Sequence, residues 1–367
     1  MERLLLIASD TIHLYRFRKE LINALKEHKQ VFVSAEDGGF VEDLKSLGVT
    51  YIETPFNRRS TNPFQDFILF CRYFAIMRKI KPNAVLTYTI KPNVYGNFAA
   101  RLLRIPVIST VSGLGDGFIN QGLVGDIVKF LYRMAFQKVS AVVFENDDDE
   151  QVMKQAKIIK TQKTIVVPGS GVNLKEHTVL EYPKNPKISF LYIGRIVYSK
   201  GIYELIEATR KLKSEYDFTV NLMGFNEEDA EKLIGQAQKD KIVSVLGFQT
   251  NIVPFIEKAH CIVLPSYREG MSNALLEGAA SGRALIATNI PGCREVVDDG
   301  VNGFLCEPRD VGSLYEAMKK FINLSLEEKA QMGEASRKKA EKDFSRDIVV
   351  NTIIDEVNSI DEINSID

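Results

Sequence analysis

The feature that most constrains the fold is an alternation of short apolar runs with longer amphipathic stretches, which occurs twice along the chain. The runs in the first half are 4–8, 30–34, 50–53, 84–88, 107–110, 141–144 and 164–167, and those in the second half are 188–193, 218–223, 242–246, 261–264 and 284–288. Short strands that alternate with helices are typical of parallel, doubly wound sheets. The alternation therefore predicts an α/β chain with two such sheets.

A short polar segment separates the two series of strands. Residues 183–187 read Pro-Lys-Asn-Pro-Lys, and a chain of 367 residues is longer than a single hydrophobic core usually supports. We expect a first domain over 1–182, a linker over 183–187, a second domain over 188–344 and a C-terminal segment over 345–367. This last segment should be helical to about residue 357, and the near-repeat that follows should be loosely ordered.

The stretch 261–277 has the pattern of a strand, a turn and a helix N-terminus. The apolar run 261–264 is followed by a turn over 265–270, and Ser272 is placed to cap a helix that carries Glu277. The alternative interpretation is an ordinary helix with one solvated Glu and another Glu in the preceding loop.

Such a junction can bind an anion. The amides of Gly270, Met271 and Ser272 should be free at the positive end of the helix, which suits a diphosphate. Glu269 lies before the helix and Glu277 inside it, so one carboxylate can contact a sugar and the other a ribose.

A second stretch, 193–201, follows another predicted strand and reads Ile-Gly-Arg-Ile-Val-Tyr-Ser-Lys-Gly. Gly194 lets a ligand approach the backbone, while Arg195 and Lys200 place two cations at the end of the strand. Together these cations can neutralise a nucleotide diphosphate and stabilise its departure without a metal. The alternative is a surface Arg and a solvated Lys at the start of a helix.

The two stretches resemble the signatures of one enzyme family. Pro-Ser-x-x-Glu-Gly-x-x-x-x-x-x-Glu at 265–277 and Gly-Arg-x-x-x-x-Lys-Gly at 194–201 are similar to motifs of the retaining family 4 glycosyltransferases. The resemblance implies the GT-B fold, in which two Rossmann-like domains face a cleft and the last helix returns to the first domain. It implies catalytic roles for Arg195, Lys200 and Glu269, and donor binding by Gly194, Phe248, Gly270, Met271, Ser272, Asn273 and Glu277.

Phe248 is assigned through its loop. Leu246-Gly247-Phe248 follows a predicted strand, and in the family this loop lies against the base of the nucleotide. A simple turn between a strand and a helix is the alternative. The implied donor is a uridine-diphosphate sugar, with no cofactor and no metal.

Acceptor recognition is expected in the first domain, where the motifs are less standard. The loop 9–16 lacks the Gly-Gly pair that many family members carry, although His13, Arg16 and Arg18 could bind a pyrophosphate-linked acceptor. A lone His is also often structural. Many relatives have a His at the end of the strand predicted at 84–88, and this chain has none there. Lys91 could instead supply positive charge at the leaving group or hold a phosphate of the acceptor.

A resemblance to one subgroup of this family, less specific than the motifs of the second domain, rests on stretches of the first domain. Thr-Ile-Lys-Pro-Asn at 89–93, together with 111–116, which contains Gly113 and Gly115, looks like bacterial enzymes that add a hexose or an N-acetylhexosamine to an undecaprenyl-diphosphate sugar. We therefore expect Gly113 and Gly115 to contribute to acceptor binding.

Charge is unevenly distributed along the chain. Residues 1–170 carry 23 Lys and Arg against 17 Asp and Glu. The stretch 56–104 holds nine basic residues and one acid, interleaved with aromatic residues that include Phe56, Phe64, Phe67, Phe70, Tyr73 and Phe74. A basic and aromatic face suits an anionic membrane surface, so we expect peripheral membrane contact here. The alternative is an ordinary amphipathic helix whose core stripe is Phe67, Phe70, Phe74 and Met77.

Other features limit the functional classes. The four Cys are far apart and mostly within apolar runs, so we expect reduced core residues and no metal site. The acidic run at 146–150 is expected to cap a helix rather than to hold a metal. No run of eighteen apolar residues and no signal peptide is evident, which predicts a cytoplasmic protein at the inner face of the membrane. We expect no binding to nucleic acid.

These interpretations combine into one expected function. The chain should be a retaining transferase that moves a sugar, most simply an N-acetylhexosamine such as GalNAc, from a UDP-sugar to an undecaprenyl-diphosphate-linked saccharide in polysaccharide or glycan biosynthesis. An epimerase or phosphorylase-like enzyme on the same fold and a non-catalytic sugar-binding protein are the alternatives. Front-face attack and a covalent intermediate both remain open as retaining mechanisms.

Overall fold

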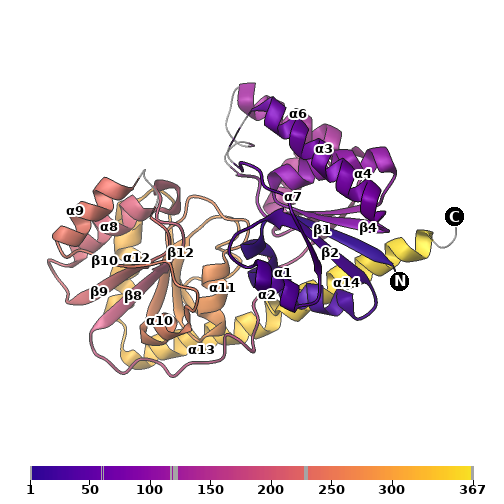
Figure 1. Cartoon of the computed structure of the whole chain (residues 1–367). Coiled ribbons are helices and arrows are strands. Elements are labelled where there is room, and N and C mark those ends of the chain that lie inside the picture. Colours follow the sequence, from indigo (N-terminus) through magenta and orange to yellow (C-terminus); the bar gives the residue numbers. More distant parts are fainter. Residues whose placement is uncertain are drawn as a thin grey trace. The chain divides into compact units, whose positions relative to one another are not determined.

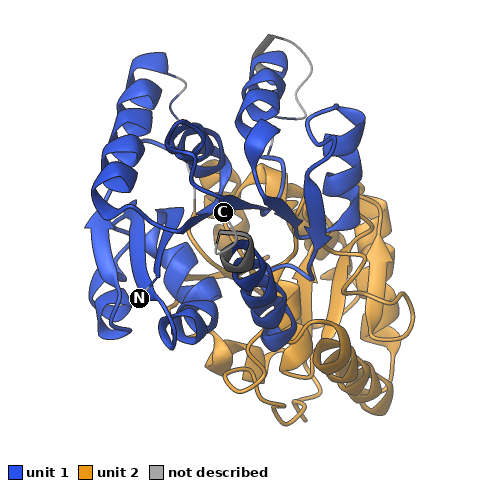
Figure 2. Ribbon diagram, turned by 90° about the vertical axis from the view of Figure 1, so that its right-hand side faces the viewer, with its two compact units in different colours: residues 1–170, 346–367 blue, residues 171–345 orange. Residues whose placement is uncertain are grey.

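A computed structural model describes residues 2–58, 60, 62–115, 118, 123–226 and 230–364. The chain divides into two compact units, which Figure 1 shows along the chain and Figure 2 shows in separate colours. The first unit is Met1–Ser170 with Arg346–Asp367, and the second is Gly171–Ser345. Each unit is built on one parallel sheet, as the alternation of apolar runs predicts.

The sheet of the first unit has the order β3-β2-β1-β4-β5-β6-β7. Its strands are β1 (Arg3–Asp10), β2 (Gln30–Glu36), β3 (Thr50–Glu53), β4 (Ala84–Tyr88), β5 (Val107–Val111), β6 (Ala141–Phe144) and β7 (Lys163–Val166). The helical elements are α1 (Thr11–Lys26), α2 (Val41–Ser46), α3 (Pro63–Ile80), a π-helical turn η1 (Pro92–Gly96), α4 (Asn97–Leu103), α6 (Leu123–Ala135), a 3-10 turn η2 (Phe136–Lys138), α7 (Asp147–Gln155) and α14 (Arg346–Asn364).

Helices cover both faces of this sheet because alternate strand residues point in opposite directions. In β1, Leu4 and Leu6 belong to the core beneath α1 and α14, whereas Leu5 and Ile7 belong to the core beneath α3, α4 and α6. A strand that is apolar on both faces is typical of the centre of a parallel sheet. The first unit is therefore a doubly wound, three-layer domain.

The last helix, α14, packs against α1 within the first unit (yellow in Figure 1). Val349, Ile353 and Val357 join the core on that face, and an Nη1 atom of Arg346 lies 2.9 Å from Glu20 Oε2. The expected return of the final helix to the first domain is thus confirmed. The prediction that helix ends near residue 357 is wrong, because Ile360 is also buried and the helix continues to Asn364.

The second unit holds a sheet of order β10-β9-β8-β11-β12-β13. Its strands are β8 (Ile188–Ile193), β9 (Phe218–Met223), β10 (Ser244–Gly247), β11 (Cys261–Leu264), β12 (Ala284–Thr288) and β13 (Gly303–Cys306). The helical elements are a 3-10 turn η3 (Tyr198–Lys200), α8 (Ile202–Leu212), α9 (Glu231–Lys239), α10 (Val253–Lys258), α11 (Asn273–Ala280), α12 (Val311–Asn323) and α13 (Leu326–Asp343). The sequence prediction lacks β13, because Phe304 and Leu305 alone are too short an apolar run.

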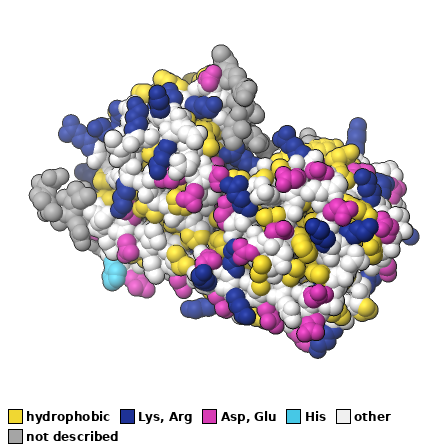
Figure 3. All heavy atoms as spheres, turned by 180° about the vertical axis from the view of Figure 1, so that it is seen from behind, with side chains coloured by type: hydrophobic (Ala, Val, Ile, Leu, Met, Phe, Trp, Pro, Cys, Tyr) yellow, Lys and Arg dark blue, Asp and Glu magenta, His cyan; other side chains and the backbone are white. Residues whose placement is uncertain are grey.

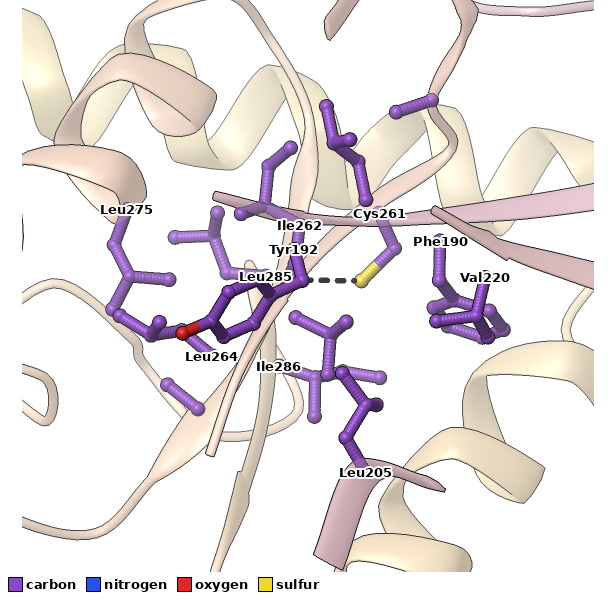
Figure 4. Close-up of a cluster of buried hydrophobic side chains, with 14 of the residues drawn as sticks. Phe190, Tyr192, Leu205, Val220, Cys261, Ile262, Leu264, Leu275, Leu285 and Ile286 are labelled. Atoms are coloured by element: carbon purple, nitrogen blue, oxygen red, sulfur yellow. Dashed lines mark hydrogen bonds between the residues drawn. The ribbon is translucent and has the colours of Figure 1, made fainter. Parts of the chain in front are cut away.

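One core fills the second unit. Figure 4 shows part of it, where Phe190 of β8 is the in-register neighbour of Val220 of β9 and Cys261 of β11 on one face of the sheet. Ile262 of β11 and Leu285 of β12 lie on the other face. These side chains are fully or almost fully buried. Burial of a large apolar side chain stabilises the fold by roughly 1.5–3 kcal/mol, so this core holds the strand ends rigidly in place.

The chain passes between the units earlier than the Pro-containing segment 183–187 indicates. The division lies at residues 170 and 171, because the following residues pack on the second unit. The carbonyls of Leu180 and His177 accept hydrogen bonds from Arg283 and Arg337, respectively. The hydroxyl of Tyr182 donates a hydrogen bond to the carbonyl of His260. These contacts are not visible in the local sequence pattern.

The cysteines only partly follow the expectation of core residues. Cys261, Cys293 and Cys306 are buried free thiols, and burial raises the pKa of each. Cys71 is exposed on α3, so that part of the prediction is wrong. The buried residues of this helix are Leu69, Tyr73, Met77 and Ile80, and Cys71 lies on another face.

Candidate functional site

The candidate donor site lies at the carboxyl ends of β8 and β11 in the second unit. β8 pairs with β9 on one side and with β11 on the other. The connections that leave β8 and β11 therefore lead to opposite sides of the sheet, and such a switch point is where open α/β sheets bind ligands. The segment 194–201 follows β8, and the segment 265–272 follows β11.

Lys200 and Glu269 meet at this switch point. Lys200 Nζ lies 2.6 Å from Glu269 Oε1, and the same oxygen accepts from Ser266 Oγ at 2.7 Å. The two side chains are only 19% and 12% exposed. A charge-assisted hydrogen bond with little access to solvent fixes both groups. The structure therefore joins the two predicted motifs, which lie 69 residues apart.

Backbone packing also locks the two motif loops together. The amide of Tyr267 donates to the carbonyl of Ser199 at 3.0 Å. Gly201 has φ +72°, and a Cβ at this position would lie 1.9 Å from the carbonyl oxygen of Pro265. Only glycine fits both the left-handed backbone and this close approach.

The side chain of Tyr267 is held as well as its amide. Its hydroxyl donates to the buried carboxylate of Glu204 on α8, with distances of 2.7 and 2.9 Å to the two oxygens. Burial and this carboxylate raise the pKa of Tyr267 well above its usual range. The loop that carries Glu269 is thus anchored to α8 as well as to η3.

Ser272 caps α11 as predicted. Its side chain accepts from the amide of Leu275. Its own amide, however, donates to the carbonyl of Gly292 at 2.9 Å. The prediction of three free amides is therefore wrong at Ser272, because the loop after β12 approaches this turn. Met271 is buried, so only its backbone can face a ligand.

The helix α11 carries the remaining predicted donor residues. Asn273 is its first residue, and Glu277 lies one turn further on. Glu277 Oε1 is 4.0 Å from Nε2 of His177, and the Glu277 side chain is 20% exposed. Sequence reasoning missed His177, which lies in a segment without strand or helix and is brought to α11 only by tertiary packing.

Arg195 and Gly194 occupy the end of β8. Arg195 is exposed, and its carbonyl accepts from the hydroxyl of Tyr192 at 2.5 Å. The amide of Gly194 donates to the carbonyl of Met223 at 2.9 Å, which ties this loop to the end of β9. The guanidinium of Arg195 is thus carried on a backbone that is fixed on two sides.

Phe248 is one half of an exposed aromatic pair. Its ring stacks on Phe225 with centroids 4.2 Å apart and planes 12° apart, and the two side chains are 39% and 54% exposed. Phe225 follows β9, as Phe248 follows β10, and the amide of Gly224 donates to the carbonyl of Gly247. Sequence reasoning missed Phe225, although both residues follow a Gly at the end of a strand.

In the first unit, His13 is tied to the end of β1. Its Nδ1 lies 2.7 Å from Oδ1 of Asp10, which also caps α1 by accepting from the amide of His13. Arg58 reaches the other oxygen of Asp10 at 2.6 Å. Burial acts to raise the pKa of Asp10, but the hydrogen bonds and charges of His13 and Arg58 outweigh it and hold that pKa below its usual value.

Lys91 is held by three acceptors. Its Nζ lies 2.6 Å from Oδ1 of Asp66, 2.9 Å from the carbonyl of Asn57 and 2.7 Å from the carbonyl of Ser60. These acceptors match the three donors of the ammonium group. In this arrangement Lys91 fixes the segment before α3, and the charge that was expected to face a ligand is directed at Asp66.

Arg16, Gly113 and Gly115 are the remaining predicted acceptor residues. The guanidinium of Arg16 lies over the ring of Phe40, with 5.8 Å to its centroid. Gly113 and Gly115 follow β5 and both have positive φ, 110° and 68°. Asp116, which completes the predicted motif, lies outside the described residues.

Arg18 is not available to an acceptor, contrary to the expectation. It is buried, with an Nη2 atom 3.2 Å from Oε1 of Glu145, and its guanidinium lies over the ring of Tyr88. Burial raises the pKa of Glu145, and the charge of Arg18 offsets part of that rise. Such a pair joins α1 to the end of β6.

The acidic run at 146–150 acts as a helix cap, as predicted. The side chain of Asn146 accepts from the amide of Asp149 at 2.8 Å, and four acidic residues follow in the first turn of α7. Carboxylates near a helix N-terminus interact favourably with the helix dipole.

Comparison with known sequences accounts for most of the chain. Residues 3–146 match the family described as "Glycosyl transferase 4-like", and residues 173–339 match "Glycosyl transferases group 1". A curated relative from Campylobacter jejuni is 28% identical over 333 residues, which are 86% of this chain and 87% of the relative. It is named N,N'-diacetylbacillosaminyl-diphospho-undecaprenol alpha-1,3-N-acetylgalactosaminyltransferase.

Other relatives and solved structures agree with these matches. An Escherichia coli protein named UDP-Gal:alpha-D-GlcNAc-diphosphoundecaprenol alpha-1,3-galactosyltransferase is 24% identical over 80% of both chains. A glycosyltransferase from Rickettsia africae superposes with a TM-score of 0.78 over 98% of both chains at 20% identity. Anabaena HepE in complex with UDP gives 0.76 over 98% of this chain and 100% of HepE at 18% identity. With its two parallel-sheet units and both family matches, the chain is a glycosyltransferase of the GT-B fold that combines a glycosyl transferase 4-like domain with a group 1 glycosyl transferase domain.

Proposed function

We propose that this glycosyltransferase moves a sugar, most simply an N-acetylhexosamine such as GalNAc, from a UDP-sugar to an undecaprenyl-diphosphate-linked saccharide, with retention at the anomeric carbon. The product would serve the synthesis of a surface polysaccharide or glycan. The observation that carries the proposal is the pair of Lys200 and Glu269, which places a cation and a carboxylate side by side at the switch point of the second unit. The names of the two bacterial relatives support the class of acceptor.

The cations of this site suit a departing diphosphate. Lys200 is fixed by Glu269, while Arg195 stands exposed on a rigid strand end. When the bond between the anomeric carbon and the diphosphate oxygen breaks, negative charge develops on that oxygen. Positive groups that are already in place stabilise this charge without reorganisation. We therefore propose transfer that needs no metal and survives a chelator.

The carboxylates have separate roles in the proposal. Glu269, which is held by Lys200 and Ser266, can accept a hydrogen bond from a hydroxyl of the donor sugar and so orient the sugar. Glu277 on α11 can accept hydrogen bonds from the ribose hydroxyls, because its side chain remains partly exposed. The stacked rings of Phe225 and Phe248 provide an apolar surface for the uracil base.

Retention follows if the acceptor attacks from the face that the diphosphate leaves. The acceptor oxygen then forms the new bond to the anomeric carbon, and its proton passes to the departing phosphate oxygen. This route needs no side chain as a base. A covalent route would require a carboxylate on the opposite face of the sugar and would leave a glycosylated peptide, which mass spectrometry of the protein during turnover detects.

The lipid part of the acceptor requires access to a membrane, and α3 supports a peripheral contact. Phe64 and Phe67 are 70% and 61% exposed, so the core-stripe alternative is wrong at Phe67. It is confirmed at Met77, which is buried, and at Phe70 and Phe74, which are partly buried and pack against the same core. Figure 3 shows basic and hydrophobic side chains next to one another over the first unit. Such a surface favours an anionic bilayer. Within the described residues, none of the helices has the length and apolar character that crossing a bilayer requires.

A donor screen tests the proposal. Purified protein is incubated with a panel of UDP-sugars and a synthetic undecaprenyl-diphosphate N-acetylhexosamine, with and without EDTA, and the lipid product is followed by mass and by the NMR coupling of the new anomeric proton. We expect one UDP-sugar to lengthen the lipid with retained configuration in EDTA. Products formed from a sugar nucleotide alone would instead indicate an epimerase, and an inverted linkage would refute retention.

A further inference from the structure

The first unit contains a cavity of about 720 Å³, and of its lining residues Lys91 alone belongs to a predicted motif. Its lining comes from the segment after β3, the first half of α3, the end of β2 and the residue before η1. The lining residues are Glu36, Pro55, Phe56, Asn57, Arg58, Gln65, Asp66, Ile68, Leu69, Arg72 and Lys91. A volume of this size matches that of sites for small ligands.

We propose that this cavity binds the diphosphate and first sugar of the lipid-linked acceptor, and that the outer face of α3 receives the beginning of its hydrocarbon chain. The inference rests on the proposed function for the identity of the ligand as an acceptor. It assigns the head group to Arg58 and Arg72, which no sequence motif singles out.

The location of the cavity favours a ligand site. In the first sheet, β1 lies between β2 and β4, so the connections after β1 and β4 leave toward opposite sides. Ser9 and Thr89 meet there, with their hydroxyls 2.5 Å apart. Arg58 of the cavity pairs with Asp10 at the end of β1, and Lys91 follows β4. The cavity therefore adjoins the switch point of this sheet.

Two guanidinium groups supply the positive charge. Arg58 donates one hydrogen bond from Nη1 to the carboxylate of Asp10. Arg72 donates one hydrogen bond from Nη1 to the carbonyl of Pro55, at 2.5 Å. Among the described residues these are the only partners that the structure records for either group. Each guanidinium has five donors in a planar fork, so most remain available to phosphate oxygens.

The acid on the cavity wall does not cancel this charge. Asp66 is 16% exposed, and its two oxygens are occupied by Lys91 at 2.6 Å and by the hydroxyl of Tyr95 at 2.8 Å. Lys91 and Asp66 neutralise one another and brace the wall. Arg58 is paired with Asp10, whereas Arg72 has no carboxylate partner among the described residues. The lining itself holds three cations against the two acids Glu36 and Asp66, a net charge of +1. The phosphates of a diphosphate fit that charge.

The same cavity has groups that suit a sugar. Glu36 and Gln65 present a carboxylate and an amide, which can accept and donate hydrogen bonds to hydroxyl and acetamido groups. Phe56 is partly buried in the wall and offers an aromatic face. Polar hydrogen-bonding groups beside an aromatic ring are appropriate for a carbohydrate.

An apolar path leads out of the cavity along α3. Ile68 lines the cavity and is 37% exposed, and Phe67 and Ile68 lie three and four positions after the exposed Phe64 on the same helix. Residues at these spacings share one helical face. A ligand with a charged head and a hydrocarbon tail matches this sequence of surfaces, because the tail can remain in the bilayer that the same face contacts.

Photolabelling tests the position of the site. The full-length chain is irradiated with a prenyl-diphosphate N-acetylglucosamine that carries a diazirine on the sugar, with and without unlabelled acceptor as competitor. We expect competable labelling of peptides within residues 55–72. Competable labelling confined to other segments would overturn the proposal.

Binding to variants tests the assigned residues. Arg72→Gln should raise the Kd for the unmodified prenyl-diphosphate N-acetylglucosamine about tenfold, while Arg78→Gln, an exposed change on the same helix outside the cavity, should not. The same sugar diphosphate without a prenyl chain should bind more weakly but keep its dependence on Arg72. Phe67→Ser should weaken only the prenyl form. Thermal melting confirms that each variant is folded.

The outcomes separate this inference from the proposed function. If lipid product forms normally but Arg58→Gln and Arg72→Gln bind the probe as the unmodified protein does, the cavity assignment is wrong and the function stands. If the probe binds through Arg72 but no UDP-sugar gives a lipid product, the cavity assignment stands and the proposed reaction fails.

Discussion

The two units share a design but assemble their candidate sites differently. Each has a parallel sheet with a switch point, between β1 and β4 in the first unit and between β8 and β11 in the second. In the second unit, Arg195, Lys200 and Glu269 lie on the two segments that follow the switch strands, and Glu277 lies on the helix that the second segment enters. In the first, Arg58, Arg72 and Lys91 come from a loop, a helix and a π-helical turn boundary.

This difference teaches why one site is readable from sequence and the other is not. A site made from two contiguous loops appears as two motifs with fixed spacing, such as 194–201 and 265–277. A site made from single residues on separate elements appears only after folding. Substitutions that alter one loop, one ring or one charge therefore test whether the two sites bind their ligands independently, as this comparison indicates.

The largest effect is expected from Gly201→Ala. A Cβ would lie 1.9 Å from the carbonyl of Pro265, so the loops that carry Lys200 and Glu269 must separate. We expect a loss of at least about 3 kcal/mol of stability and no measurable sugar transfer. Calorimetric melting and turnover measure both. Gly235→Ala on α9 is the control, since no atom lies within 4 Å of its added Cβ and the change should be neutral or stabilise slightly.

A smaller but still severe effect is expected from Lys200→Ala. This change removes a cation from the developing diphosphate charge and leaves Glu269 without its ion-pair partner. Turnover should fall roughly 10²- to 10³-fold. Lys319→Ala, which breaks a pair with Glu215 elsewhere in the unit, should leave turnover unchanged. Activity of Lys200→Ala within threefold of the unmodified enzyme would remove the central argument for the donor site.

Phe225→Ala should have a moderate effect on the donor alone. It removes one ring of the pair with Phe248, so UDP should bind about fivefold to tenfold more weakly by calorimetry. Tyr203→Ala, an exposed aromatic change on α8, is the matched control. Equal affinities in the two variants would show that the stacked pair does not contact the base.

The smallest effect concerns Asp10, whose pKa is held below its usual value of 3.8. Its ionised form therefore stabilises the fold above that value, and the contribution is lost as pH falls through the lowered pKa. Asp10→Asn keeps a capping side chain but removes the charge. We expect its urea midpoint to lie below that of the unmodified protein at pH 7 and the gap to close in acid. A gap that stays constant with pH would contradict this role.

Much of the fold could be predicted because strand and helix periodicities are local. Five of the six strands of the second unit and all seven of the first coincide with predicted apolar runs. The strand β13 could not be found, since its apolar run is two residues long. The boundary at residues 170 and 171 depends on contacts of Leu180, Tyr182 and His177 that form only after folding.

The same division holds for the sites. The pairing of Lys200 with Glu269 completes two motifs that the sequence already shows. The involvement of Ser272's amide with Gly292 was not predictable, because the partner lies on a loop twenty residues away. In the first unit, Arg18 is buried beside Glu145 and does not face a ligand, whereas Lys91 is paired with Asp66 on the wall of the cavity. Charge in a sequence does not state which acid lies next to it.

The separation of the two sites is tested most directly by crossed initial-rate kinetics. Rates are measured over a matrix of UDP-sugar and prenyl-diphosphate sugar concentrations for the unmodified enzyme, Phe225→Ala and Arg72→Gln. We predict that Phe225→Ala raises only the KM for the UDP-sugar and that Arg72→Gln raises only the KM for the lipid acceptor. If both variants alter the same KM, or each alters both equally, the assignment of donor to the second unit and acceptor to the first is contradicted.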